Sequence, residues 1–161
     1  MRTSKIRKES KDPVRPLLYI DMDGVLVDFD SGVKGLSQEI RETYASCLDE
    51  VPGIFSLMNP MPGALEAIDE LYDLFDIYIL STAPWNNPSA WADKLNWVKQ
   101  YLGDRFKKRV ILCHHKDFLK GDFLVDDREK NGAKEFSGEW IHFGSNVFPN
   151  WEAVVNYLKK V

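Results

Sequence analysis

The chain has 161 residues, of which 44% are hydrophobic and 29% are charged, and it carries a formal net charge of −4. This length and balance fit one globular domain and exclude a fibrous repeat or a disordered chain. The negative charge disfavours a nucleic-acid polymer as partner, and no apolar run is long enough to cross a bilayer. We expect a cytoplasmic monomer or homodimer with no membrane partner.

Residues 1–16 are polar and basic, since six Arg and Lys side chains outnumber Glu9 and Asp12. This segment lacks the apolar stretch of a secretory signal peptide, so we expect none. Terminal segments of this kind are usually solvated. We therefore predict a mobile basic tail at 1–16, followed by a single domain at 17–161.

The segment Leu17 to Val27 runs from apolar β-formers into two carboxylates, Asp21 and Asp23, at a glycine turn. Aspartate is depleted in strands and is costly to bury without a partner. The pair therefore needs hydrogen bonds or a cation, and Mg²⁺ with a phosphate is a natural choice. A strand whose acidic end merely meets solvent is an open alternative for this motif taken alone.

Residues 31–58 do not follow a simple alternation of strands and helices. Ser37 to Leu48 looks helical, and Pro52-Gly53 interrupts the pattern before residues 54–58. We predict a small, mostly helical cap insert after the first strand. Its apolar side chains are compatible with packing or with substrate contact.

Further short apolar runs predict strands at 77–80, 110–112, 123–125 and 140–143. Helical periodicity covers 64–74, 91–102 and 151–158, with turn or cap residues before the first and last of these. Near-continuous apolar strands that alternate with amphipathic helices indicate an α/β domain with a parallel sheet. The predicted architecture is a three-layer, doubly wound, Rossmann-like fold.

Polar side chains follow the first four predicted strands: Asp21 and Asp23 after the first, Ser81 and Thr82 after the second, residues 113–116 (CHHK) after the third, and Asp126 and Asp127 after the fourth. Parallel strands end at one edge of a sheet, so these groups should surround one small anion. His114 and His115 lack a third metal ligand, and we interpret them as surface or loop residues.

The order of Asp-x-Asp, Ser/Thr, Lys and Asp-Asp at successive strand ends resembles the haloacid dehalogenase (HAD) superfamily of aspartate-nucleophile phosphohydrolases. This likeness covers nearly the whole chain after Leu17. Residues 21–29 (DMDGVLVDF) are similar to the first motif of the 5'(3')-deoxyribonucleotidases, the cytosolic type C nucleotidases. Further matches are residues 60–64 (PMPGA), 82–84 (TAP), Lys94 with Trp97-Val98, and Lys116 ten residues before Asp126-Asp127-Arg128.

The resemblance implies a magnesium-dependent phosphomonoesterase that works through an aspartyl-phosphate. Asp21 is the implied nucleophile, and Asp23 is the implied proton donor and acceptor. Asp21, the backbone carbonyl of Asp23 and Asp126 are the implied Mg²⁺ ligands. Asp127 is implied to orient Lys116 or a metal-bound water.

The implied substrate is a small phosphorylated molecule, with a (deoxy)ribonucleoside 5'-monophosphate expected first. Thr82, Ala83 and Lys116 are implied to bind the phosphate. Ser81 is an alternative hydroxyl to Thr82, and Lys120 is an alternative amine to Lys116. Phe29 is compatible with stacking on a base or with core packing. Lys94 is compatible with a phosphate contact or with a solvated helix face.

Two features depart from the family pattern: the insert at 31–58 is short, and Ala83 replaces a serine. They leave a sugar phosphate or another small phosphomonoester open as substrate. A receiver domain also clusters acids, a hydroxyl and a lysine, but its acceptor aspartate lies on a later strand. A catalytically silent binding scaffold is disfavoured because every expected catalytic side chain is present.

Overall fold

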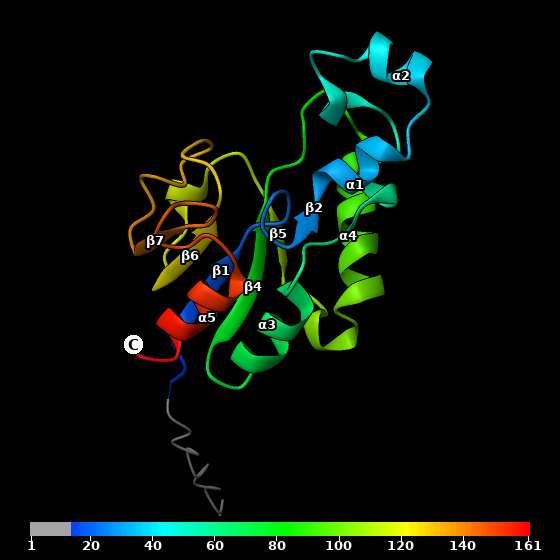
Figure 1. The fold of residues 1–161 in the computed structure, drawn as a ribbon. Helices are drawn as coiled ribbons and strands as arrows, with labels where there is room; N and C mark the ends of the chain where they lie inside the picture. Colours follow the sequence, from blue (N-terminus) through cyan, green and yellow to red (C-terminus); the bar gives the residue numbers. More distant parts are fainter. Residues whose placement is uncertain (1–13) are drawn as a thin grey trace, which may run out of the picture.

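Five parallel strands form one sheet at the centre of the protein (Figure 1). In this computed structural model, which describes residues 14–161, the strands are β1 Leu17–Ile20, β4 Asp76–Ser81, β5 Val110–Leu112, β6 Phe123–Asp126 and β7 Glu139–His142. Their order is β5-β4-β1-β6-β7, so β1 lies in the middle. The predicted strands are confirmed, with only small shifts at their ends.

Three of the predicted helices also form: α3 Ala64–Leu71, α4 Ser89–Tyr101 and α5 Trp151–Leu158. The start of α5 agrees with the prediction because the Asn150 side chain accepts a hydrogen bond from the backbone N–H of Ala153 (3.0 Å). Helix α3 ends earlier than predicted, and Leu74 is 46% exposed in the turn that follows. Its apolar periodicity therefore overstates the length of the buried helical face.

The two faces of the sheet are covered differently. Leu18 and Ile20 of β1 pack in one core cluster with buried side chains of α3, α4 and α5. Tyr19 points to the other face, where its ring meets the edge of Phe136. No described α-helix contributes to that second cluster. The α/β fold with a parallel sheet is confirmed, but turns form its second layer because residues 127–138 carry Asn-Gly and Ser-Gly dipeptides instead of a helical period.

A small insert connects β1 to α3. It contains the helices α1 Phe29–Lys34 and α2 Gln38–Thr43 and the 3-10 turns η1 Leu48–Glu50 and η2 Ile54–Leu57, and the short strands β2 Val27–Asp28 and β3 Asn59–Pro60 pair at its base. Turn η2 packs on α4, and the insert extends beyond the carboxyl ends of the strands (Figure 1). Ser37 caps α2, but the helix ends at Thr43. It is therefore shorter than the helix predicted at Ser37 to Leu48.

Most of the predicted basic tail lies outside the described residues. Near the start of residues 14–161, the Arg15 guanidinium donates a hydrogen bond to the carbonyl of Tyr72 (3.0 Å). The Pro16 carbonyl accepts the N–H of Asp76 (2.9 Å), which continues the pairing of β1 with β4. Within residues 14–161, no helix has both the length and the apolar character that crossing a membrane requires.

Candidate active site

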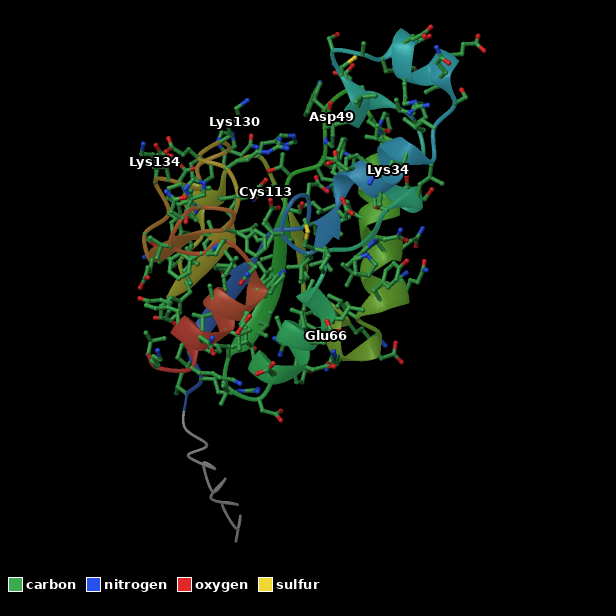
Figure 2. All side chains as sticks on the ribbon, viewed as in Figure 1. Lys34, Asp49, Glu66, Cys113, Lys130 and Lys134 are labelled. Atoms are coloured by element: carbon green, nitrogen blue, oxygen red, sulfur yellow. The ribbon has the colours of Figure 1, made fainter. Side chains whose placement is uncertain are left out.

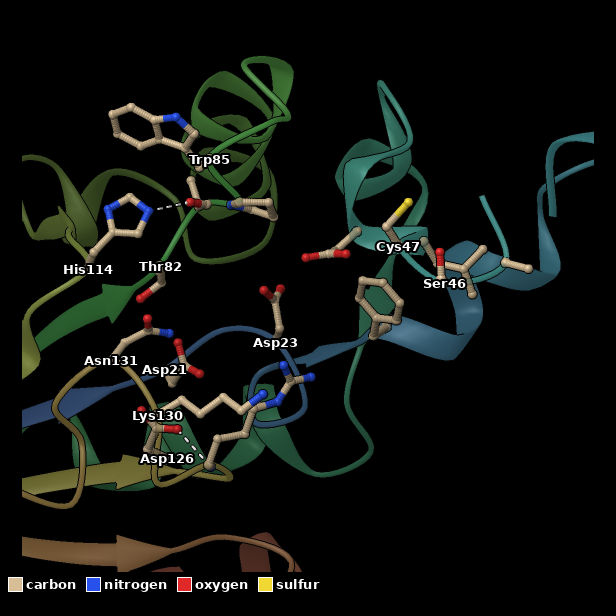
Figure 3. A pocket seen from close by; sticks show the side chains of 17 residues that line it. Asp21, Asp23, Ser46, Cys47, Thr82, Trp85, His114, Asp126, Lys130 and Asn131 are labelled. Carbon is tan, nitrogen blue, oxygen red and sulfur yellow. Dashed lines mark hydrogen bonds between the residues drawn. The ribbon is translucent and has the colours of Figure 1, made fainter. Parts of the chain in front are cut away.

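The strand ends singled out in the sequence converge at the carboxyl edge of the sheet (Figure 3). Asp21 follows β1, Thr82 follows β4, and Asp126 closes β6. Lys116, which follows β5, places its Nζ 3.1 Å from Asp21 Oδ1 and also hydrogen-bonds to Asp126. Lys120 is exposed, and its backbone carbonyl accepts a hydrogen bond from the Tyr19 hydroxyl. Of the two lysines considered, the structure brings Lys116 to this edge.

Three carboxylates form an acidic cluster: Asp21, Asp126 and Asp127 each offer an oxygen within 4.8 Å of the others. Burial raises the pKa of Asp126 to about 6, and the charge of Asp21 adds to this effect while Lys116 opposes it. Burial and Asp21 also raise the pKa of Asp127. Burial lowers the pKa of Lys116, but Asp21 and Asp126 outweigh it, so the net pKa is raised and Lys116 stays charged.

The cluster fits a hard divalent cation. The Asp127 Oδ1 atom is buried and has no hydrogen-bond partner among residues 14–161. Gly24, at φ +75°, leaves the space that Asp127 needs, since a Cβ at position 24 would lie 2.3 Å from Asp127 Oδ2. Carboxylate oxygens are the ligands that Mg²⁺ prefers. The ion pairs of Lys116 are with Asp21 and Asp126, and Asp127 instead lies 3.7 Å from Arg128 Nε.

Asp23 is held by a buried lysine. Lys94 of α4 is 0% exposed, and its ammonium donates to Asp23 Oδ2 (2.6 Å) and to Ser81 Oγ (3.1 Å). The solvated-face interpretation of Lys94 is therefore wrong, and its amine contacts Asp23 where a phosphate contact was expected. Burial raises the pKa of Asp23, Lys94 opposes this, and Asp21 adds to it.

Two hydrogen bonds connect the loop after β4 to the loop after β5. The Thr82 hydroxyl donates to the Cys113 carbonyl (2.7 Å), and His114 Nε2 donates to the Ala83 carbonyl (3.0 Å). Of the two hydroxyls considered, Thr82 lines the pocket and Ser81 is buried behind it. The single O–H of Thr82 is already engaged, so Thr82 presents only acceptor lone pairs to the pocket.

A pocket of about 500 Å³ opens above the acidic cluster (Figure 3). Its floor includes Asp21, Asp23 and Asp126, and Phe29 of α1 lies on the insert side, with its ring 6.0 Å from that of Phe55. The remaining lining residues come from the insert, from the loops after β4 and β5, and from the loop after β6: Ala45, Ser46, Cys47, Leu48, Asp49, Thr82, Ala83, Pro84, Trp85, His114, Arg128, Lys130 and Asn131. Figure 2 shows Asp49 in the insert and Lys130 in the loop after β6.

His114 is the pocket residue that sequence reasoning most clearly missed. Its ring lies 5.9 Å from that of Trp85, which is 82% exposed, and 6.1 Å from that of Trp91. The signal for it was present, because His114 stands in the polar segment that follows β5. The lining residues Arg128, Lys130 and Asn131 follow β6 in the same way.

Comparison with a solved structure agrees with this fold. A crystal structure of a HAD-superfamily hydrolase of subfamily IA from Geobacter sulfurreducens superposes with a TM-score of 0.58, covering 92% of this chain and 99% of that chain at 12% identity. The five-stranded parallel sheet thus has the same fold as this HAD-superfamily hydrolase.

Sequence comparisons identify the family within that class. The family model of the 5' nucleotidase, deoxy (pyrimidine), cytosolic type C proteins matches residues 39–153. A protein of Vibrio phage KVP40 assigned as a 5'(3')-deoxyribonucleotidase is 54% identical over 149 residues, covering 92% of this chain and 88% of the relative. The human cytosolic-type 5'(3')-deoxyribonucleotidase is 30% identical over 155 residues, covering 78% of this chain and 77% of that protein. The chain belongs to this nucleotidase family of phosphomonoester hydrolases.

Proposed function

We propose that this protein is a magnesium-dependent nucleotidase that hydrolyses (deoxy)ribonucleoside 5'-monophosphates through an aspartyl-phosphate on Asp21. One observation carries the proposal: Asp21 stands at the floor of the pocket, contacted by the Lys116 ammonium and flanked by two further carboxylates. The names of the relatives support a nucleotide substrate. Phe29 supports it too, because it lines the pocket and an aromatic ring can stack on a base.

The chemistry takes two steps on this chain's own carboxylates. A carboxylate oxygen of Asp21 forms a bond to phosphorus while the bond to the leaving-group oxygen breaks. Asp23 donates its proton to that departing oxygen, and its raised pKa favours the protonated form which this requires. Asp23 then accepts a proton from the water that attacks the aspartyl-phosphate, so inorganic phosphate leaves, Asp21 is restored as a carboxylate and Asp23 is restored in its protonated form.

The phosphoryl oxygens need positive charge and donors near Asp21. Lys116 supplies the charge, and its contacts with Asp21 and Asp126 fix the direction of its amine. The backbone N–H groups of the loop at Thr82 and Ala83 are the donors proposed there, because the Thr82 hydroxyl is engaged by Cys113. This arrangement does not depend on a serine at position 83.

The residues present fit Mg²⁺. Asp21 and Asp126, together with the backbone carbonyl of Asp23, are the proposed ligands, and Asp127 borders the same space. When bound, Mg²⁺ screens the repulsion between the anionic nucleophile and the anionic phosphate. The buried Oδ1 atom of Asp127, which has no hydrogen-bond partner among the described residues, supports this assignment, since leaving a buried polar atom unpartnered is otherwise costly.

The proposal is tested by steady-state hydrolysis of nucleoside monophosphates, ribose 5-phosphate and p-nitrophenyl phosphate. Asp21→Asn should lower kcat by at least about 10³-fold with an unchanged circular dichroism spectrum, because an amide is a poor nucleophile. EDTA should abolish the activity of the parent, and added Mg²⁺ should restore it. Asp126→Ala should stay inactive when Mg²⁺ is added.

Three results would contradict the proposal. Activity of Asp21→Asn within about tenfold of the parent would remove Asp21 as nucleophile. Full activity in EDTA would remove the metal. Equal kcat/KM for ribose 5-phosphate and for every nucleoside monophosphate would leave a general phosphatase in place of a nucleotidase.

A further inference from the structure

We propose that Lys94 is a positioning residue that anchors one carboxylate oxygen of Asp23 and thereby presents the other to the leaving-group oxygen of the substrate. The inference rests on the proposed role of Asp23 in proton transfer. It gives Lys94 a different task from the phosphate contact expected from the sequence.

The two oxygens of Asp23 are in unlike surroundings. Oδ2 accepts a hydrogen bond of 2.6 Å from the Lys94 ammonium. Oδ1 is buried, yet no residue within 14–161 hydrogen-bonds to it. Asp23 also lines the pocket (Figure 3). A carboxyl group whose second oxygen is anchored and whose first is unpartnered can exchange a proton with a ligand without breaking an internal hydrogen bond.

Lys94 is itself fixed from several sides. Its ammonium donates to Ser81 Oγ (3.1 Å) at the end of β4 and lies 4.4 Å from the centroid of the Phe55 ring in η2. Its side chain is completely buried on α4. These contacts come from the sheet, the insert and a helix, so the position of Oδ2 is tied to the rigid part of the fold. A positioned group needs this kind of support to hold its geometry.

A direct contact of Lys94 with the substrate does not fit its complete burial outside the pocket lining. Lys94 is absent from the pocket lining, whereas Asp23, which accepts the hydrogen bond of the Lys94 ammonium, lines the pocket. A purely structural ion pair is the remaining alternative. Structural and positioning roles differ in one measurable respect: only the positioning role makes the effect of removing Lys94 depend on the leaving group and on the presence of Asp23.

The experiment compares Lys94→Met, which keeps the length of the side chain without the charge, with Lys94→Gln, which keeps an N–H donor. The matched control is Lys99→Met on the exposed face of the same helix. On a nucleoside 5'-monophosphate, whose alkoxide leaving group needs a proton, Lys94→Met should lower kcat about 10- to 100-fold, which is part of the roughly 10²- to 10⁴-fold that a general acid typically contributes. On p-nitrophenyl phosphate the loss should stay below about threefold. Lys94→Gln should fall between the parent and Lys94→Met, and Lys99→Met should match the parent.

A double-mutant cycle with Asp23→Asn completes the test. In the Asp23→Asn background, Lys94→Met should change kcat by less than about twofold, because residues that act as a unit are not additive. Thermal melting followed by circular dichroism shows whether each variant is folded. If Lys94→Met does not fold, Lys94→Gln is used in its place to compare the losses in kcat on the two substrates.

Other outcomes overturn the inference in distinguishable ways. A rise in KM on both substrates would make Lys94 a substrate ligand, and equal or additive losses in kcat would make it structural. If Asp23→Asn itself slowed both substrates equally, the proposed role of Asp23 would fail, and the role of Lys94 would fail with it. If Asp23→Asn discriminated between the leaving groups and Lys94→Met did not, only the inference about Lys94 would be lost.

Discussion

Gly24 offers the sharpest way to separate the acidic cluster from the rest of the fold. At φ +75° it has a backbone conformation that costs an L-residue about 1–2 kcal/mol. A Cβ there would also lie 2.3 Å from Oδ2 and 2.9 Å from Cγ of Asp127. Gly24→Ala therefore combines backbone strain with displacement of Asp127, and the two effects are measured in different assays.

Gly53→Ala is the matched control. Gly53 also has a positive φ, +81°, but a Cβ there would meet nothing within 4 Å. The strain alone should lower the melting temperature of both variants by about 2–8 °C, at about 2–4 °C per kcal/mol for a chain of this size. Only Gly24→Ala should raise the Mg²⁺ concentration needed for half-maximal activity, by about 10- to 100-fold, as is usual when the support of a metal ligand is disturbed.

Activity titrated with Mg²⁺ and thermal melting by circular dichroism are the two assays. The reasoning is refuted if Gly24→Ala and Gly53→Ala need the same Mg²⁺ concentration, because Asp127 would then not contribute to the cation site. It is also refuted if Gly53→Ala raises the Mg²⁺ requirement, because backbone strain far from the cluster would then be sufficient.

Three further predictions concern the pocket and the buried carboxylates. Phe29→Ala should lower kcat/KM for nucleoside monophosphates about 5- to 150-fold, the equivalent of about 1–3 kcal/mol of stacking, while ribose 5-phosphate is hydrolysed nearly unchanged; equal losses would make Phe29 a packing residue. His114→Phe keeps a ring beside Trp85 but removes the donor to the Ala83 carbonyl, so KM should rise about 2- to 12-fold on all substrates, whereas His115→Phe, at an exposed position, should leave KM unchanged. Because burial raises the pKa of Asp126 from 3.8 to about 6, the folded state binds more protons than the unfolded state between these values; in EDTA the free energy of unfolding should therefore gain a contribution as the pH falls from 7 toward 4. Urea unfolding at both ends of this range should show that contribution in the parent and not in Asp126→Asn.

The strands and their ends could be predicted because both follow from local pattern. Short apolar runs such as Ile77 to Leu80 are buried strands, and parallel connections bring their carboxyl ends to one edge. Asp21, Lys116 and Asp126 therefore met in space although 95 residues separate Asp21 from Lys116 and ten separate Lys116 from Asp126. No packing detail was needed to place them together.

The position of Lys94 could not be predicted in the same way. Its place on α4 has the polar character of a solvated face, and its burial depends on Asp23, 71 residues away, and on the insert residue Phe55. The kind of segment that covers the second face of the sheet could not be predicted, for a related reason. Turns containing Ala133 and Phe136 cover Tyr19 there, and their apolar side chains follow no regular period.

The exposed and the buried ion pairs of this chain differ in what they contribute to the stability of the fold. Exposed pairs such as Lys134 with Glu129 contribute little, because solvent screens them. Lys94 and Lys116, in contrast, are both buried with carboxylates, and burying two ammonium groups costs more than packing apolar side chains of similar volume. Each buried lysine contacts one of the two aspartates of the first motif: Lys116 meets Asp21, and Lys94 meets Asp23. The two pairs thus hold the proposed nucleophile and the proposed proton donor by separate lysines, which gives each carboxylate the fixed geometry that the proposed two-step transfer needs.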